Sequence, residues 1–447
     1  MVMKNWMFVF ILMVLFHACG GHAETAFTFS LPLDDERIVV LETASERIPL
    51  TLERGDSLRT TSFALALNGG EYARIWVGDF AFTVWLEDGK PWTTKLKWNE
   101  LHFEGAGADI NNYLNRRWMH EIYFRDYYVM SEAAYLERLE QVVQEREKIL
   151  RERDLDPNYT AREMKRIHWL RGYYLAQMAS RVDERAEKIV LSEKYLGELK
   201  EVAKEETVCW GIPEYPEAIK RALFALAGEE EKTSDAVGRM QRVLKLATEN
   251  YKDKRLVEYI VHKSVMEYAG QKGLDGASEL DRVHRACVER NDYVMAYEKM
   301  YDVCKKLFKG QPAISFTFQD TTGNEVSLSD FMGKYVYIDI WATWCGPCNA
   351  ELPYLAKLEK ALEGKNICFV GISCDFELEN WKAFVKEEKL GGVQVYMNGD
   401  KEFMNAVLCN SVPRFMLIDR EGKYIDANMT RPSNPETLKT LEALPGI

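Results

Sequence analysis

The chain has 447 residues, more than one hydrophobic core usually serves, which predicts several domains. It is 47% hydrophobic and 29% charged, as globular proteins are, and its net charge of -12 with no basic patch argues against a nucleic-acid partner. Nine cysteines are scattered along it, so it is not a dense disulfide scaffold. The composition predicts a multidomain globular protein.

The first 23 residues read as an export signal rather than as part of the fold. Met7–Phe16 is an apolar run behind Lys4, too short to span a membrane and typical of a signal-peptide core. The sequence FHAC that ends at Cys19 resembles a bacterial lipobox, in which the cysteine is lipidated; alternatively, a signal peptidase cuts after Ala23. We expect residues 1–23 to be a signal peptide, with Cys19 as the candidate lipidation site.

Residues 24–110 are predicted to form a β-rich domain. Ile38–Leu41, Arg74–Val77 and Ala81–Leu86 are runs that favour strands, and turn signals such as Asp88-Gly89 separate them. We expect a small β-sandwich.

Residues 111–308 are predicted to form an all-α domain. They are rich in Glu, Lys, Arg, Leu and Ala, with apolar residues at helical spacing. Breaks are expected at Asp156-Pro157-Asn158 and at Gly228, among other positions. No fixed repeat period is present, so a solenoid is not predicted.

Residues 310–447 alternate between strand and helix signals and are predicted to form an α/β domain. Tyr335–Trp341 is a nearly continuous apolar run, as in a central strand buried on both faces. Cys348–Leu362 is expected to be helical, and Ile367–Ser373 is expected to be a second buried strand.

The sequence WATWCGPC places Cys345 and Cys348 where that first strand passes into the helix. The first N–H groups of a helix lack partners and carry partial positive charge, which stabilises a thiolate. Cys345 is therefore predicted to be the exposed nucleophile and Cys348 the resolving thiol. Zinc would need a second ligand pair, yet residues 310–447 contain no second C-x-x-C and no histidine. A purely structural disulfide is the other alternative.

This region resembles thioredoxin in its WCGPC sequence, in Asp339 and in Pro353. Together with Val326–Phe331 and the sequence PRFMLIDREGKYI from Pro413, it resembles the TlpA/ResA-like thiol–disulfide oxidoreductases of bacterial envelopes. The resemblance implies a thioredoxin fold that needs no metal, nucleotide or flavin, because the cysteines carry the electrons. It covers residues 310–447 only.

The resemblance also implies roles for single residues. Cys345 and Cys348 would form the redox-active disulfide, and Asp339 would lie beneath Cys348 as its proton acceptor. Arg414 stands where the family commonly has Thr, and could favour acidic or polar substrate surfaces. The substrate-binding residues implied are Trp344, Val412 and Pro413, the last in a cis peptide bond.

We therefore expect a reductant of protein disulfides, with protein dithiols or disulfides as substrates and a thiol electron donor. Residues 24–308 loosely resemble modules that precede this domain in Gram-negative lipoproteins. The expected location is thus the cell envelope or periplasm of a Gram-negative bacterium, with a lipid anchor in the membrane. Alternatives are a disulfide isomerase or oxidase, and a binding protein whose helical domain dominates its function.

Overall fold

The structure is a computed structural model, and two compact units make up the part of the chain that it describes. One lies within Met1–Ser234 and Glu249–Leu256, the other within Asp235–Thr248 and Val257–Ile447. The predicted signal peptide and Cys19 lie outside the described residues. The structure describes residues 24–67, 69–116, 130–180, 191–230 and 236–447.

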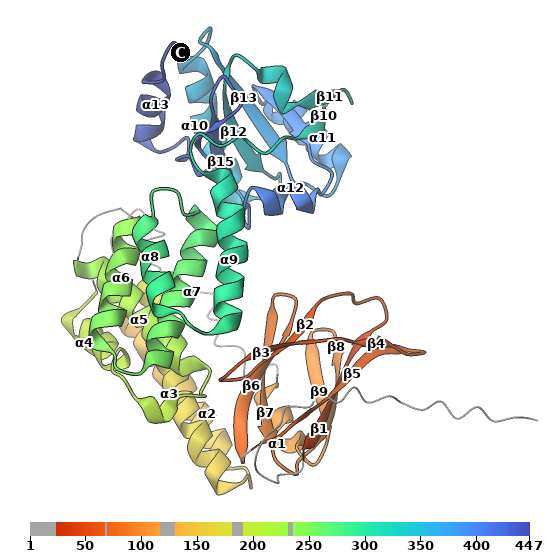
Figure 1. Cartoon of the computed structure of the whole chain (residues 1–447), viewed down its shortest axis with the longest axis vertical. Coiled ribbons are helices and arrows are strands. Elements are labelled where there is room, and N and C mark those ends of the chain that lie inside the picture. Colours follow the sequence, from red (N-terminus) through yellow and green to blue (C-terminus); the bar gives the residue numbers. More distant parts are fainter. Residues whose placement is uncertain (1–23, 68, 117–129, 181–190, 231–235) are drawn as a thin grey trace, which may run out of the picture. The chain divides into compact units, whose positions relative to one another are not determined.

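The first unit begins with two β-sheets (Figure 1). They share one hydrophobic core. Alternate residues of β8 are buried, as expected of strands with one face on a core. One sheet has, in order, the strands β4 (Glu53–Arg54), β5 (Leu58–Leu65), β1 (Thr25–Pro32), β8 (Trp92–Lys97) and β9 (Glu100–Gly105). The other has β3 (Arg47–Leu50), β2 (Val39–Glu42), β6 (Gly70–Val77) and β7 (Phe80–Glu87).

Helices follow these sheets in the first unit. Ser131 and Ser192 cap α2 and α4 by accepting a backbone N–H, which satisfies a donor that the helix leaves free. The break predicted at Gly228 is wrong, because α5 continues through it; the neighbouring Ala and Leu residues outweigh the cost of about 1 kcal/mol for one helical glycine. The helices are α1 (Ala108–Leu114), α2 (Glu132–Arg151), α3 (Pro157–Ser180), α4 (Glu193–Val202) and α5 (Glu214–Glu230).

A buried ion-pair network joins α3 to α5 and to the sheet. Arg166 donates to Glu163 at 2.9 Å and to Glu214 at 2.6 Å. The Tyr72 hydroxyl on β6 donates to the same Glu163 carboxylate. Because a buried charge is costly unless it is paired, this network fixes the two helices and the strand together.

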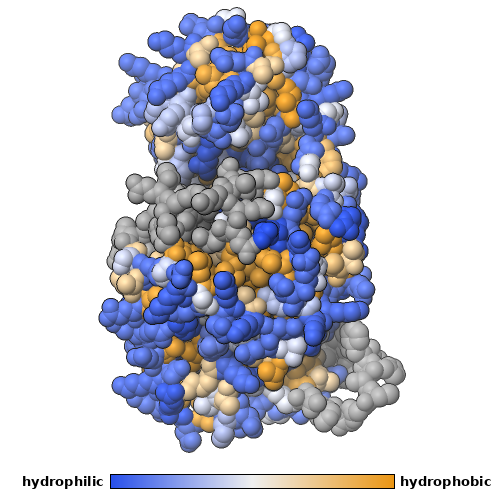
Figure 2. All heavy atoms as spheres, turned by 90° about the vertical axis from the view of Figure 1, so that its left-hand side faces the viewer, coloured by the Kyte–Doolittle hydropathy of each residue, from blue (hydrophilic) through white to orange (hydrophobic). Residues whose placement is uncertain are grey.

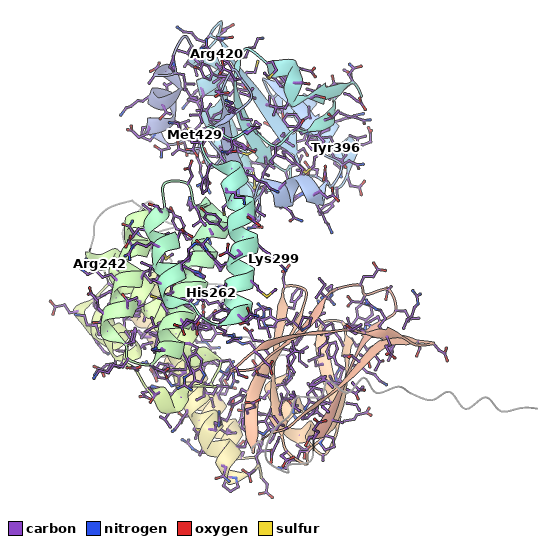
Figure 3. All side chains as sticks on the ribbon, viewed as in Figure 1. Arg242, His262, Lys299, Tyr396, Arg420 and Met429 are labelled. Atoms are coloured by element: carbon purple, nitrogen blue, oxygen red, sulfur yellow. A yellow bond between two sulfur atoms is a disulfide. The ribbon has the colours of Figure 1, made fainter. Side chains whose placement is uncertain are left out.

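The second unit opens with helices, of which α7, α8 and α9 meet at a buried histidine pair. His262, labelled in Figure 3, and His284 lie with ring nitrogens 3.1 Å apart, and each stacks on a tyrosine of α9. Burial lowers the pKa of His284 to about 4, so this ring is neutral at pH 7. The helices are α6 (Ala236–Asn250), α7 (Lys254–Lys272), α8 (Ser278–Cys287) and α9 (Asn291–Cys304).

The C-terminal domain is built on a seven-stranded mixed sheet. Strand β12 runs parallel to β13 and antiparallel to β15, and every residue of β12 is buried, as its apolar run predicts. In order, the strands are β11 (Glu325–Ser327), β10 (Thr317–Asp320), β14 (Val393–Tyr396), β13 (Ile367–Ser373), β12 (Tyr335–Trp341), β15 (Arg414–Ile418) and β16 (Tyr424–Asp426).

Helices cover this sheet through two apolar clusters. Leu355 of α10 and Leu441 of α13 pack with Tyr337 of β12. Trp381 of α11 packs with Tyr396 of β14, which is labelled in Figure 3, and their ring centroids are 5.6 Å apart. Strand β14 and helix α12 were not predicted. The helices are α10 (Gly346–Ala361), α11 (Leu378–Glu388), α12 (Lys401–Ala406) and α13 (Pro435–Glu442).

The coarse prediction is confirmed: sheets come first, helices occupy the middle of the chain, and an α/β domain with a mixed sheet follows. The exact domain boundaries stay predictions. Within the described ranges, no helix combines the length and apolarity needed to cross a membrane. Figure 2 shows a mostly hydrophilic face interrupted by smaller hydrophobic patches.

Candidate active site

The N-terminus of α10 carries the two cysteines of the CGPC sequence. Cys345 is the N-cap of the helix, and its Sγ accepts the Cys348 backbone N–H at 3.1 Å. The two cysteines form a disulfide with an S–S distance of 2.02 Å. Pro347 lies in the first turn, where its missing N–H leaves no hydrogen bond unmade. Cys345 is 5% exposed and Cys348 1%, so Cys345 is the more accessible cysteine but is less exposed than predicted.

The segment before β15 lies against this disulfide. The Val412 carbonyl oxygen is 3.7 Å from Cys345 Sγ, and the peptide bond between Val412 and Pro413 is cis. The sheet explains the proximity: β15 pairs antiparallel with β12, with Arg414 opposite Ile340, so its start lies beside the end of β12. The structure thus brings together the predicted Cys345, Cys348, Val412 and Pro413.

Asp339 lies on β12 and is buried, with 3% exposure. Its Oδ1 has no hydrogen-bond partner among the described residues. Burial, and secondly the charge of Glu351, raise the pKa of Asp339 to about 8. Glu351 is itself held by the Ser433 backbone N–H and hydroxyl, each at 2.9 Å. A carboxyl that titrates near neutral pH is suited to exchange protons with a thiol.

Asp375 joins two loops beside the disulfide. Its carboxylate accepts the Thr343 backbone N–H at 3.1 Å, the Thr343 hydroxyl at 2.7 Å and the Ser373 hydroxyl at 2.7 Å. Trp344 follows Thr343 and is 61% exposed; Phe376 follows Asp375 and is 81% exposed. One buried carboxylate therefore holds the two segments that present these exposed aromatic side chains.

We expect Asp375→Asn to lower the free energy of unfolding by roughly 2 kcal/mol, because one carboxylate oxygen becomes an NH₂ that cannot accept from the Ser373 hydroxyl, and the charge that strengthens the remaining bonds to Thr343 is lost. Urea unfolding of the C-terminal domain would measure the change. Glu377→Gln removes the same charge from an exposed neighbouring side chain that makes no helix-capping bond, and should stay within about 0.5 kcal/mol of the parent. Equal effects of both variants would contradict the assignment.

Arg414 does not face substrate, so that expectation is wrong. Its side chain is buried and donates to the Gln271 carbonyl and to the Asn428 side chain, both at 3.0 Å. The Asn410 side chain donates to the neighbouring Gly270 carbonyl at 2.9 Å. These carbonyls belong to the last turn of α7, which has no intrahelical donors for them. Arg414 and Asn410 thus cap a helix instead of binding a partner.

The other described cysteines are not disulfide-bonded. The remaining cysteines in the described ranges, among them Cys374 and Cys409, are free thiols. Burial raises the pKa of Cys374 to about 11 and that of Cys409 to about 12, which keeps them as unreactive thiols. Across the described part of the chain, no group of three or more His, Cys, Asp or Glu side chains could hold a metal ion.

The C-terminal domain is similar to known proteins with thiol–disulfide chemistry. Residues 308–444 match the family model described as Redoxin. The thiol-disulfide oxidoreductase ResA of Bacillus subtilis is 28% identical over 129 residues, which is 29% of this chain and 72% of ResA. ResA of Bacillus cereus is 29% identical over 148 residues, 32% of this chain and 85% of its own. The solution structure of a candidate thiol-disulfide oxidoreductase from Bacteroides vulgatus is 52% identical and covers 29% of this chain and 87% of its own, with a TM-score of 0.28.

The fold and the disulfide define the C-terminal domain as thioredoxin-like. Residues 308–444 belong to the Redoxin family and are of the TlpA/ResA type, as the resemblance implied, and the chain is a thiol–disulfide oxidoreductase.

Sequence reasoning missed several groups around the site. Asp375 lies two residues after the predicted strand Ile367–Ser373 but was not singled out, and Gln394 lies on the strand that was not predicted. Glu359 lies on a predicted helix but carries no motif. The one available signal was the polarity of Gln394 inside the apolar run Val393–Tyr396, which is unusual for a buried strand.

Proposed function

We propose that this protein reduces disulfide bonds of other proteins in the cell envelope through a Cys345–Cys348 dithiol. The observation that carries the proposal is the hydrogen bond from the Cys348 N–H to Cys345 Sγ at the N-terminus of α10. The same amide and the helix dipole would stabilise a Cys345 thiolate once the disulfide is reduced.

In this reaction the Cys345 thiolate attacks a substrate disulfide, a mixed disulfide forms, and the first substrate thiolate leaves. Cys348 gives its proton to Asp339 and attacks Cys345 Sγ, which releases the second substrate thiolate. Two electrons pass from the dithiol to the substrate, and Cys345–Cys348 ends as a disulfide. A thiol electron donor must then reduce it again, and no metal, nucleotide or flavin takes part.

Exposed apolar side chains support a protein substrate. Trp344 and Phe376 present aromatic rings to solvent from two loops beside the disulfide. In this proposal the Val412 backbone, whose carbonyl lies next to Cys345 Sγ, pairs with an extended peptide of the substrate. A protein segment around a cystine offers both apolar side chains and a backbone to pair with.

The proposed location is the envelope or periplasm of a Gram-negative bacterium, with a lipid anchor at Cys19. The apolar run Met7–Phe16 and the sequence before Cys19 support export and lipidation. Metabolic labelling with a fatty-acid analogue would test the anchor, and Cys19→Ala should abolish the label.

The reduction potential of the Cys345–Cys348 pair tests the direction of the reaction. We expect about -270 mV or lower, as for thioredoxin, since the Gly346-Pro347 dipeptide adds no charge that would stabilise the dithiol form further. Thiol trapping in defined dithiol buffers would measure it. A value of about -120 to -180 mV would instead indicate an oxidase or isomerase. If the pair showed no redox transition, the alternative of a binding protein would be favoured.

A further inference from the structure

A cavity of about 210 Å³ lies behind Asp339. It is lined by Asp339 and Gln394 of the sheet, by Leu355 and Glu359 of α10, and by Lys389 and Gly391 after α11. Asp339 is buried, whereas Lys389 and Gly391 are exposed, so the cavity connects a buried carboxyl group with the surface. Its volume accommodates several water molecules, each of which occupies about 30 Å³ in the liquid.

The sheet register brings the polar groups of this cavity together. Asp339 of β12 pairs with Gly371 of β13, and Gly371 pairs with Gln394 of β14. Residues that pair directly have side chains on the same face of a sheet. A Cβ at position 371 would lie 2.2 Å from Gln394 Oε1, so the Gln394 side chain occupies the space that glycine leaves free. No side chain from β13 therefore separates Gln394 from Asp339.

Glu359 enters the cavity from the helix side in a similar way. A Cβ on Gly391 would lie 2.0 Å from Glu359 Oε2, so this glycine is what makes room for the carboxylate. Gln394 Nε2 donates to the Gly391 carbonyl at 2.8 Å, which places the amide and the carboxylate on the same short segment.

Two buried acceptors around this cavity lack partners. Asp339 Oδ1 and Gln394 Oε1 have no hydrogen-bond partner among the described residues. A buried polar atom without a protein partner is normally satisfied by water, and both atoms belong to residues that line a space large enough for it.

We propose that Glu359, through water held by Gln394, passes to solvent the proton that Asp339 takes from Cys348. This inference rests on the proposed function. In the resolving step the Cys348 thiol loses its proton to the Asp339 carboxylate. The Cys348 sulfur bonds to Cys345 Sγ, the mixed disulfide breaks, and the substrate leaves as a thiolate that is protonated by solvent. Near pH 7 Asp339 is mostly protonated, so it must lose a proton along the cavity before it can accept the Cys348 proton, and it loses that second proton by the same path afterwards. Blocking the path therefore slows the resolving step.

The charged groups around the cavity are consistent with proton transfer from Asp339 through Glu359 to solvent. Burial raises the pKa of Glu359, which brings it nearer to the pKa of Asp339, so that proton transfer between them is closer to balanced. Glu351 faces Asp339 from α10, and Glu388 and Lys389 lie at the exposed mouth of the cavity. A proton that reaches Glu359 is therefore next to solvent.

Glu359→Gln should slow the resolving step about tenfold near pH 7. Removal of a group that itself transfers the proton in the reacting step typically costs more, roughly 10²- to 10⁴-fold. The effect should shrink above pH 8, where Asp339 is ionised and hydroxide supplies another route. The reduced full chain would be mixed with dithiobis(nitrobenzoic acid), quenched with acid and mapped by mass spectrometry. Formation of the Cys345 adduct reports the first step, and its decay reports resolution.

Two further variants make the result decisive. Glu388→Gln removes a carboxylate at the mouth and should match the parent. In an Asp339→Asn background, Glu359→Gln should cause no additional slowing, because the relay has nothing to carry. Unchanged decay in Glu359→Gln, or equal slowing in both backgrounds, would overturn the inference. If the parent forms no Cys345 adduct, the proposed function itself fails.

Discussion

Replacing Cys348 with Ser should stop turnover and leave substrate proteins attached to Cys345. A serine hydroxyl cannot attack the mixed disulfide, so the reaction halts after its first step. We expect the rate of disulfide reduction to fall about 10³-fold or more, as when a covalent catalytic group is removed. Non-reducing electrophoresis of cells that express the variant would show the adducts, and mass spectrometry would identify the substrates.

The matched controls are other cysteine variants of the same domain. Cys345→Ser should lose activity to the same extent but trap nothing, because the attacking sulfur is gone. Cys409→Ser changes a buried free thiol and should retain full activity. Adducts that persist in Cys345→Ser, or full activity in Cys348→Ser, would contradict the assignment of nucleophile and resolving thiol.

Asp339→Asn should stabilise the C-terminal domain, and increasingly so as the pH rises. The pKa of Asp339 is raised in the folded state from 3.8 to about 8, so between these values the unfolded chain is ionised while the folded domain still holds the proton. The unfolded state thus binds fewer protons, and stability of the parent falls with pH. Each pH unit in this window costs the parent about 1.4 kcal/mol relative to the variant. Above pH 8 the stability difference between Asp339→Asn and the parent should therefore reach several kcal/mol.

Hydrogen exchange of β12 amides between about pH 4 and pH 9 would measure this difference in the full chain, because those amides report opening of their own domain. Asp320 supplies the opposite sign: hydrogen bonding by Thr322 lowers its pKa, so Asp320→Asn should lose stability relative to the parent above its pKa, not gain it. A pH-independent gap between the parent and Asp339→Asn would show that Asp339 is already ionised in the folded domain.

Much of the redox centre could be predicted because it is local in sequence. Tyr335–Trp341 and Cys345–Cys348 are a strand, a turn and a helix start in succession, and each element has its own pattern. The apolar run, the Gly-Pro dipeptide and the cysteine spacing all lie within one short segment, so each can be recognised without knowing which distant residues pack against it. The strand Ile367–Ser373 was predicted with the bounds that the structure has, for the same reason: its apolar run is uninterrupted.

Strand β14 was missed because it is short and follows two glycines, and only its pairing with β13 and β10 makes it a strand. Arg414 was misread because its partner, the last turn of α7, lies 143 residues earlier in the chain. From the sequence, a charged residue beside the expected substrate-binding segment suggests substrate recognition, and only the tertiary structure shows that Arg414 instead contacts the end of a helix.

The sequence by itself determined the chemistry: two cysteines at a helix start, and an acidic residue on the strand before them. Only the tertiary structure decided which groups surround that acid. Asp339, Gly371 and Gln394 are separated by more than 20 residues at each step, yet the strand register places them in one row. Helix spacing and strand alternation are properties of neighbouring residues, whereas register, and the space left by a glycine, arise only when distant strands pair.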